Sequence, residues 1–183
     1  DYYGDNAEYS YFEGCSQGGR QAFMSAQRYP QDFDGIIAGA PAFNYQGLNA
    51  AGTWNLQRIF RDNLVGNLAT DSTGDGSPDS LALLDKLHDR VLLKCDARDG
   101  VQDGVIGDPL ACDFNPSVDL SDLMCPSDKA GSDCFTTAQL QTINDLYNGP
   151  SDSSGRAVYP GKMFGSELRL SLIHISEPTR PLR

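Results

Sequence analysis

Positive charge is scarce in this chain of 183 residues, and long apolar runs are missing. Lysine and arginine together number 14 against 25 aspartates and glutamates, which leaves a net charge of −11 and a pI of about 4.4. An acidic surface repels phosphate backbones and anionic lipid headgroups, so we expect no nucleic acid partner and no charged membrane surface. No apolar run reaches membrane-spanning length, so we expect no membrane association.

Histidine and closely spaced cysteines are also lacking. The chain has two histidines and no CxxC pair, which argues against a zinc–thiolate site. Its first residues do not show the basic and then apolar pattern of a signal segment. Because Asp1 is not a natural first residue and the chain starts within a folding pattern, we expect the sequence to be a fragment of a longer protein.

The five cysteines form a pattern typical of a disulfide-bonded protein. Cys95 and Cys112 bracket one acidic, glycine-rich loop, and Cys125 and Cys134 bracket a second polar loop. Such pairs predict two disulfides, an oxidising compartment and therefore secretion to the extracellular space. The alternative is that these residues are buried free thiols. Cys15 has no partner in this pattern.

The start of the chain predicts a βαβ unit. Residues 9–13 are rich in aromatics and typical of a strand, residues 20–29 are rich in helix formers and end at Pro30, and residues 34–40 are typical of a buried strand. A strand, a sharp turn, a helix and a second strand imply a parallel sheet. We therefore expect part of an α/β domain over residues 1–41.

The remainder of the chain has a different character. Helical patterns at residues 48–67, 81–93 and 136–147 are separated by acidic loops, and strand and helix no longer alternate. We interpret residues 42–169 as a lid inserted into the α/β domain. Residues 170–183 look like a translated sequencing adaptor and are expected to be a non-native tail, the alternative being a genuine variable tail.

A candidate nucleophile lies in the turn between the first predicted strand and the helix. The run Gly14-Cys15-Ser16-Gln17-Gly18 fits the pattern G-x-S-x-G. A nucleophile between strand and helix sits on a strained turn, where flanking glycines let the neighbouring backbone pass. The N–H of Gln17, at the start of the helix, is then placed to stabilise an oxyanion. The motif predicts an α/β-hydrolase fold with Ser16 as nucleophile, and the alternative is a glycine–serine turn without chemistry.

Three runs of sequence around this motif resemble the tannase and feruloyl esterase family. They are YFEGCSQGGRQ at residues 11–21, AQRYP at residues 26–30 and FDGIIAGAPA at residues 33–42. The resemblance implies a secreted serine esterase of the α/β-hydrolase fold with an inserted, loop-rich, calcium-binding lid. Its implied substrates are phenolic esters, either feruloyl groups on plant polysaccharides or galloyl groups in tannins, cleaved through an acyl-enzyme.

The same resemblance bears on the rest of the catalytic machinery. In the family the catalytic acid and histidine lie far downstream, and a cysteine after that histidine bonds to the cysteine that Cys15 matches. His88 lies in a helical pattern with no adjacent cysteine and is interpreted as a surface residue, and His174 belongs to the suspected tail. We therefore expect the fragment to lack its acid, its base and the partner of Cys15. Without a base, a serine hydroxyl is a weak nucleophile at neutral pH, so the fragment is expected to be inactive alone.

Acidic residues recur in the loop between the first bracketing cysteines. Asp96, Asp99 and Asp103 fall within eight residues, and the backbone carbonyls of Val101 and Val105 lie close to them in sequence. Ca²⁺ takes six to eight oxygen ligands from carboxylates and carbonyls. Spacing alone leaves a calcium site and a solvated acidic loop as alternatives. The segment resembles the family's calcium site, with three aspartates and two carbonyls, which implies a structural Ca²⁺.

Other patterns are weaker. An EF-hand-like start at residues 71–79 has Ala82 where the twelfth-position glutamate is expected, so we interpret it as a surface turn. Phe43, Tyr45 and Trp54 are expected to pack in the core, with an aromatic-acid pocket as the alternative. Two functions remain open: an ester hydrolase, and a non-catalytic, calcium-stabilised secreted binding module. Within the enzyme class, a lipase or a peptidase is the second possibility.

Overall fold

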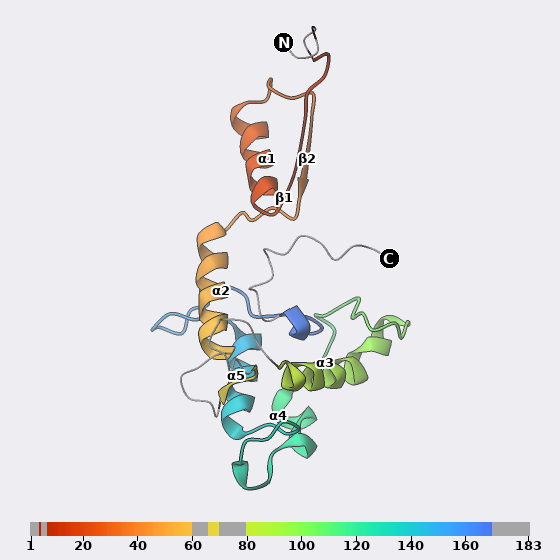
Figure 1. Ribbon diagram of the computed structural model, residues 1–183, viewed down its shortest axis with the longest axis vertical. Coiled ribbons are helices and arrows are strands. Elements are labelled where there is room, and N and C mark those ends of the chain that lie inside the picture. Colours follow the sequence, from red (N-terminus) through yellow and green to blue (C-terminus); the bar gives the residue numbers. More distant parts are fainter. Residues whose placement is uncertain (1–3, 5–6, 60–65, 70–79, 170–183) are drawn as a thin grey trace. The chain divides into compact units, whose positions relative to one another are not determined.

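The chain divides into two compact units, Asp1–Asn49 and Ala50–Arg183. The computed structural model describes residues 4, 7–59, 66–69 and 80–169 (Figure 1). The division between the units falls inside helix α2, Tyr45–Ile59, whereas the sequence places a boundary after residue 41. The EF-hand-like segment, His174 and the suspected tail lie outside the described residues.

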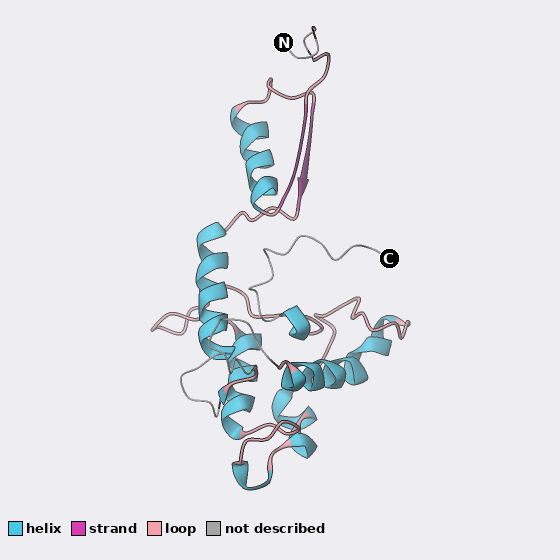
Figure 2. Ribbon diagram, in the orientation of Figure 1, coloured by secondary structure: helices cyan, strands magenta, loops and turns pink. Residues whose placement is uncertain are grey.

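The first unit is built on a βαβ motif. Strand β1, Tyr11–Cys15, leads through a sharp turn into helix α1, Gln17–Arg28, and strand β2, Gly35–Gly39, follows. The two strands pair in parallel, with Tyr11 opposite Gly35 and Cys15 opposite Gly39. Figure 2 shows the helix lying alongside the strand pair. The predicted order of elements and the predicted parallel pairing are confirmed.

Helix α1 approaches strand β2 closely through its glycine-containing first turn. Gly19 and Ala22 are its buried residues, and a Cβ atom on Gly19 would lie 2.4 Å from the carbonyl oxygen of Gly39. The sequence pattern places the helix start at Arg20, because glycine is a poor helix former. The structure starts the helix at Gln17. Gly19 lies within the helix because only a residue without a side chain lets the helix pack this close to the strand.

The second unit, in its described part, consists of helices and loops with isolated bridges in place of strands (Figure 2). Besides the end of α2, its α-helices are α3, Ala82–Cys95, α4, Pro116–Asp119, and α5, Thr137–Asn148. Short 3-10 helices cover Asp96–Asp99, Ser121–Leu123, Pro126–Asp128 and Glu167–Arg169. No helix in the described residues is both long enough and apolar enough to cross a bilayer.

Leucine and valine side chains along α3 form the centre of the core of the second unit. Leu84, Leu87 and Val91 are fully buried, in one cluster with Ile143 and Leu146 of α5. Each such side chain contributes about 1.5–3 kcal/mol through removal of apolar surface from water. The helical stripe predicted over residues 81–93 is confirmed, and it anchors α3, which leads directly into the acidic loop, in the core.

Helix α5 begins with a reciprocal cap. The side chain of Thr136 accepts the Gln139 N–H at 3.1 Å, and the Gln139 amide oxygen accepts the Thr136 N–H at 2.8 Å. This capping box satisfies two backbone donors that a helix start otherwise leaves without partners. The predicted helix over residues 136–147 is confirmed, with its start set by this cap.

The aromatic residues divide between surface and core. Phe43 is 63% exposed and packs against Phe23 with ring centroids 4.7 Å apart, and the Arg20 guanidinium lies 5.2 Å from the centre of the exposed Tyr45 ring. The expectation of core packing is therefore wrong for Phe43 and Tyr45, because Phe23 and Arg20 of α1 contact their rings at the surface. It is confirmed for Trp54, which packs against the core. An open groove of about 610 Å³ follows this face of α1.

Candidate active site

Ser16 occupies the single residue between strand β1 and helix α1. Its backbone has φ 58° and ψ −113°, a conformation that an L-residue adopts at a cost of about 1–3 kcal/mol. Three hydrogen bonds hold it there. The Ser16 N–H donates to the Gly39 carbonyl at 3.0 Å, and the N–H groups of Arg20 and Ala42 both donate to the Ser16 carbonyl at 3.1 Å. The residue is half-buried, and it lies on the strained strand-to-helix turn that the motif predicts.

Two glycines allow this turn, Gly14 and Gly19. Of the two, only Gly14 belongs to the glycine pair of the G-x-S-x-G motif. A Cβ atom on Gly14 would lie 2.4 Å from the Gly18 carbonyl oxygen, so Gly14 is required for the backbone to pass. A Cβ atom on Gly18 would meet nothing within 4 Å, so the expected steric role of Gly18 is wrong. Gly19 takes that role through its contact with β2. The consecutive glycines at the helix start are the sequence signal for it.

Gln17 is the first residue of α1 and the expected oxyanion donor. The helical series of backbone hydrogen bonds begins with the Arg20 N–H, which donates to the Ser16 carbonyl. The Gln17 N–H lies before the start of this series. The positive end of the helix dipole favours negative charge at this point. The geometry is compatible with the expected role, which stays a prediction.

The cysteine predictions are confirmed for both bracketing pairs. Cys95 bonds to Cys112 with an S–S distance of 1.97 Å, and Cys125 bonds to Cys134 at 2.03 Å. The alternative of buried free thiols is therefore wrong for these four residues. Cys15, directly before Ser16, is an exposed free thiol.

His88 is not the surface residue that the sequence indicates. Its side chain is 15% exposed, and its Nδ1 lies 2.7 Å from Oε2 of Glu167, a carboxylate with no solvent exposure. Oε1 of Glu167 accepts the Tyr147 hydroxyl at 2.8 Å and the Gly165 N–H at 2.9 Å. The helical pattern around His88 could not indicate this cluster, because its carboxylate lies 79 positions further along the chain.

Tyr147 joins the buried carboxylate to an aromatic cluster. Burial, and then the nearby charge of Glu167, raise the pKa of the Tyr147 phenol far above its ordinary value, so the hydroxyl stays protonated and donates. Its ring packs against Phe164 and Phe114, with centroids 4.6 Å and 6.4 Å away. Glu167 thus connects α3, α5 and the segment around residue 165 inside the second unit.

The three aspartates of the acidic loop fold it by accepting backbone N–H groups. Asp96 is buried and accepts the Gly104 N–H with both oxygens, at 3.0 and 3.2 Å. Asp99 accepts the N–H groups of Val101 at 3.0 Å and Gly107 at 2.8 Å, and these bonds lower the pKa of its carboxyl group. Asp103 accepts the Val105 N–H at 3.1 Å.

These donors match calcium in kind, because carboxylate and carbonyl oxygens are the hard ligands that Ca²⁺ prefers. Asp96 adds a buried carboxylate, a group that is costly to leave without a positive partner. Among the residues that the structure describes, however, no three acidic, histidine or cysteine side chains form a group that could hold a metal ion. The calcium site expected at Asp96, Asp99, Val101, Asp103 and Val105 stays a prediction.

The strained turn at Ser16, between a parallel strand and a helix, has the backbone geometry of the strand-turn-helix motif of hydrolase-type folds. Solved structures support this class. The structure of feruloyl esterase B from Aspergillus oryzae is 34% identical, with 88% of this chain and 30% of that one covered and a TM-score of 0.65. Tannin acyl hydrolase from Aspergillus niger is 25% identical, with 92% and 29% covered and a TM-score of 0.61.

Sequence comparison identifies the family. The family model described as "Tannase and feruloyl esterase" matches residues 1–173. "Probable feruloyl esterase B-1" of Aspergillus flavus is 36% identical over 172 residues, which are 94% of this chain and 30% of that protein. "Probable feruloyl esterase B" of Aspergillus clavatus is 37% identical over 168 residues, or 91% and 29%. The chain belongs to the tannase and feruloyl esterase family, and it spans about a third of the length of these relatives.

Proposed function

We propose that the full-length protein is a secreted carboxylic ester hydrolase that uses Ser16 as its nucleophile and acts on esters of phenolic acids. The observation that carries the proposal is the strained, hydrogen-bonded conformation of Ser16 between β1 and α1. A strain of this kind persists where the surrounding structure enforces it, and it is concentrated at functional sites. The names of the relatives, feruloyl esterase and tannin acyl hydrolase, support phenolic esters as substrates.

The proposed reaction has two steps. The Ser16 hydroxyl loses its proton to a general base and attacks the ester carbonyl, and the Gln17 N–H stabilises the resulting oxyanion. Collapse of this intermediate expels the alcohol, which takes up the proton from the base, and leaves an acyl-enzyme. Water then attacks the acyl group in the same way and releases the phenolic acid with Ser16 restored.

The base and its carboxylate partner are proposed to lie in the part of the protein that this chain does not contain. His88 is engaged by the buried Glu167 within the second unit. The family resemblance implies a separate histidine and acid downstream, and a disulfide that ties that histidine to Cys15. On this proposal the 183-residue chain alone is inactive. The two disulfides of the second unit support secretion, because such bonds persist in oxidising compartments.

A serine-directed phosphonate probe tests the nucleophile. We expect a fluorophosphonate to label the full-length protein once, with the adduct on the peptide that carries Ser16, because an activated serine adds to phosphorus as it adds to a carbonyl. Mass spectrometry locates the adduct. Labelling of another residue, or the absence of labelling in a folded protein, would contradict the proposal and favour the non-catalytic binding module.

We further propose that the loop of Asp96, Asp99 and Asp103 binds a structural Ca²⁺ together with the carbonyls of Val101 and Val105. A cation that binds only the folded state stabilises it by about 2.7 kcal/mol when its concentration is a hundred times the Kd. We therefore expect millimolar calcium to raise the unfolding temperature above its value in EDTA by several degrees.

Asp103 is exposed, so its carboxylate can be replaced without a change in core packing. The variant Asp103→Asn is expected to lose most of the calcium-dependent rise in unfolding temperature. The matched control Asp152→Asn, in a separate turn, is expected to keep it. Calorimetry with and without calcium distinguishes the two. An equal rise in both variants, or none in the parent protein, would show that the loop is only a solvated acidic segment.

A further inference from the structure

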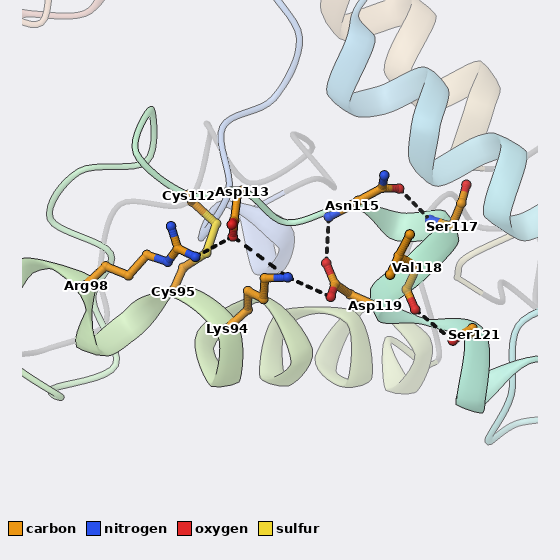
Figure 3. A network of polar contacts seen from close by, with 10 residues as sticks. All are labelled: Lys94, Cys95, Arg98, Cys112, Asp113, Asn115, Ser117, Val118, Asp119 and Ser121. Carbon is orange, nitrogen blue, oxygen red and sulfur yellow. Dashed lines mark hydrogen bonds and ion pairs between the residues drawn. A yellow bond between two sulfur atoms is a disulfide. The ribbon is translucent and has the colours of Figure 1, made fainter.

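Charged residues surround the Cys95–Cys112 disulfide on both of its chain segments (Figure 3). Arg98 lies three residues after Cys95, and its guanidinium donates to the Ala111 carbonyl at 3.0 Å and to the Asp113 carboxylate at 2.5 Å. These two acceptors are the residues directly before and after Cys112. The two donors of the Arg98 guanidinium therefore join the start of the 96–111 loop to its end, next to the disulfide.

A second contact reinforces this connection from the other side of Cys95. Lys94 Nζ lies 3.8 Å from the Asp113 carboxylate and 2.9 Å from that of Asp119. Asp119 is held in turn by the Asn115 N–H at 2.7 Å, and Asn115 caps helix α4. Figure 3 shows these side chains converging from α3, from the segment that leads into α4 and from α4 itself.

The pKa directions agree with paired charges. The hydrogen bond from Arg98 lowers the pKa of the Asp113 carboxyl, and the hydrogen bond from the Asn115 N–H lowers the pKa of the Asp119 carboxyl. Both carboxylates are therefore ionised at neutral pH. The side chains of Lys94, Arg98 and Asp113 are partly exposed, so salt screens their charges and each ion pair is expected to be individually weak.

We propose that the contacts of Arg98 and Lys94, which we call the ionic clamp, hold the ends of the 96–111 loop together independently of the disulfide and so favour its formation. The reduced protein opens this loop to some extent, whereas the oxidised protein keeps it closed. The ionic clamp forms only when the two ends of the loop are close together, so it stabilises the oxidised protein more than the reduced protein. Loss of the ionic clamp therefore makes the Cys95–Cys112 disulfide easier to reduce.

The second disulfide provides an internal control. The two ends of the Cys125–Cys134 loop are joined by backbone hydrogen bonds of their flanking residues, from the Cys125 N–H to the Phe135 carbonyl and from the Phe135 N–H to the Leu123 carbonyl, both at 2.8 Å. In the described residues the loop's ion pair, Lys86 with Asp133, connects it to α3 and does not link its two ends. Variants of the ionic clamp should therefore leave this bridge unchanged.

The test is a thiol–disulfide equilibrium on the full chain. Each bridge reacts with two glutathione thiols to give two protein thiols and one oxidised glutathione. The chain is equilibrated at fixed ratios of reduced to oxidised glutathione and quenched with acid. Its thiols are then alkylated, and mass spectrometry measures the oxidised fraction at each cysteine.

We expect Arg98→Ala to lower the equilibrium constant for oxidation of Cys95–Cys112 by about two- to five-fold, which corresponds to the loss of an exposed ion pair and its hydrogen bond. Asp113→Asn, which is nearly isosteric, should act in the same direction, and Arg98→Lys should fall between because an ammonium cannot form the fork. In 1 M salt the difference from the parent chain should shrink. The control Asp152→Asn should change neither bridge.

Two results would overturn the proposal. One is an unchanged equilibrium at Cys95–Cys112 in both Arg98→Ala and Asp113→Asn. The other is an equal shift at both bridges, which would indicate a general loss of structure and no local clamp.

Discussion

Replacement of Ser16 by alanine is expected to lower kcat for a feruloyl ester by about 10⁴-fold or more in the full-length protein, because in the proposed mechanism the acyl-enzyme forms on the Ser16 hydroxyl. Alanine keeps a Cβ atom, and the three backbone hydrogen bonds at position 16 do not involve the hydroxyl. The unfolding temperature should therefore change little. Steady-state hydrolysis and a thermal scan on the same preparations measure both quantities.

A matched control lies in the next helix. Ser25 of α1 is half-buried like Ser16, so Ser25→Ala removes an equivalent hydroxyl from the same unit. This variant is expected to keep its activity. If Ser16→Ala retained more than about a tenth of the parental activity, against the loss expected for a nucleophile, the nucleophile would lie elsewhere and the elbow would be only a structural turn.

Replacement of Glu167 by alanine is expected to cost the second unit about 3–5 kcal/mol, the range for removing one partner of a buried charged cluster. Glu167 has no solvent exposure, and its loss leaves the Tyr147 hydroxyl, the Gly165 N–H and the His88 imidazole without their acceptor. Urea unfolding followed by the fluorescence of Trp54, the chain's single tryptophan, reports on this unit because Trp54 packs against its core.

Two further substitutions distinguish the contribution of the Glu167 carboxylate to stability from that of the residues near it. Tyr147→Phe removes one donor and is expected to cost about 1–3 kcal/mol. Asp89→Ala deletes an exposed acid next to His88 and is expected to stay within about 0.5 kcal/mol of the parent, as surface substitutions do. If Glu167→Ala proved as stable as Asp89→Ala, the buried cluster would not stabilise the unit.

Much of the fold was predictable because its signals are local. The βαβ order follows from apolar runs and the break at Pro30, and the two disulfides follow from cysteines that bracket polar loops. The position of Ser16 follows from glycine and strand–helix context within a few residues. Each of these signals reflects backbone geometry or chain entropy over a short stretch, which a sequence pattern can carry.

The predictions that failed depended on distant contacts. The steric need for a glycine at position 19 comes from the carbonyl of Gly39, twenty positions away in sequence. The burial of His88 depends on Glu167, and the surface position of Phe43 depends on Phe23 of α1. A helical stripe indicates which face of a helix is apolar, but it does not say which polar group from another segment will meet it.

The sequence by itself determined the turn at Ser16, because a glycine-flanked serine between a strand and a helix permits few backbone conformations. It also determined the pairing of the bracketing cysteines, since short loops bring their ends together readily. Only the tertiary structure decided that Glu167 lies buried between α3 and α5 and that Arg98 joins Ala111 to Asp113. A buried carboxylate or a forked guanidinium is stabilised only where several separate segments supply its partners, and packing alone brings those segments together.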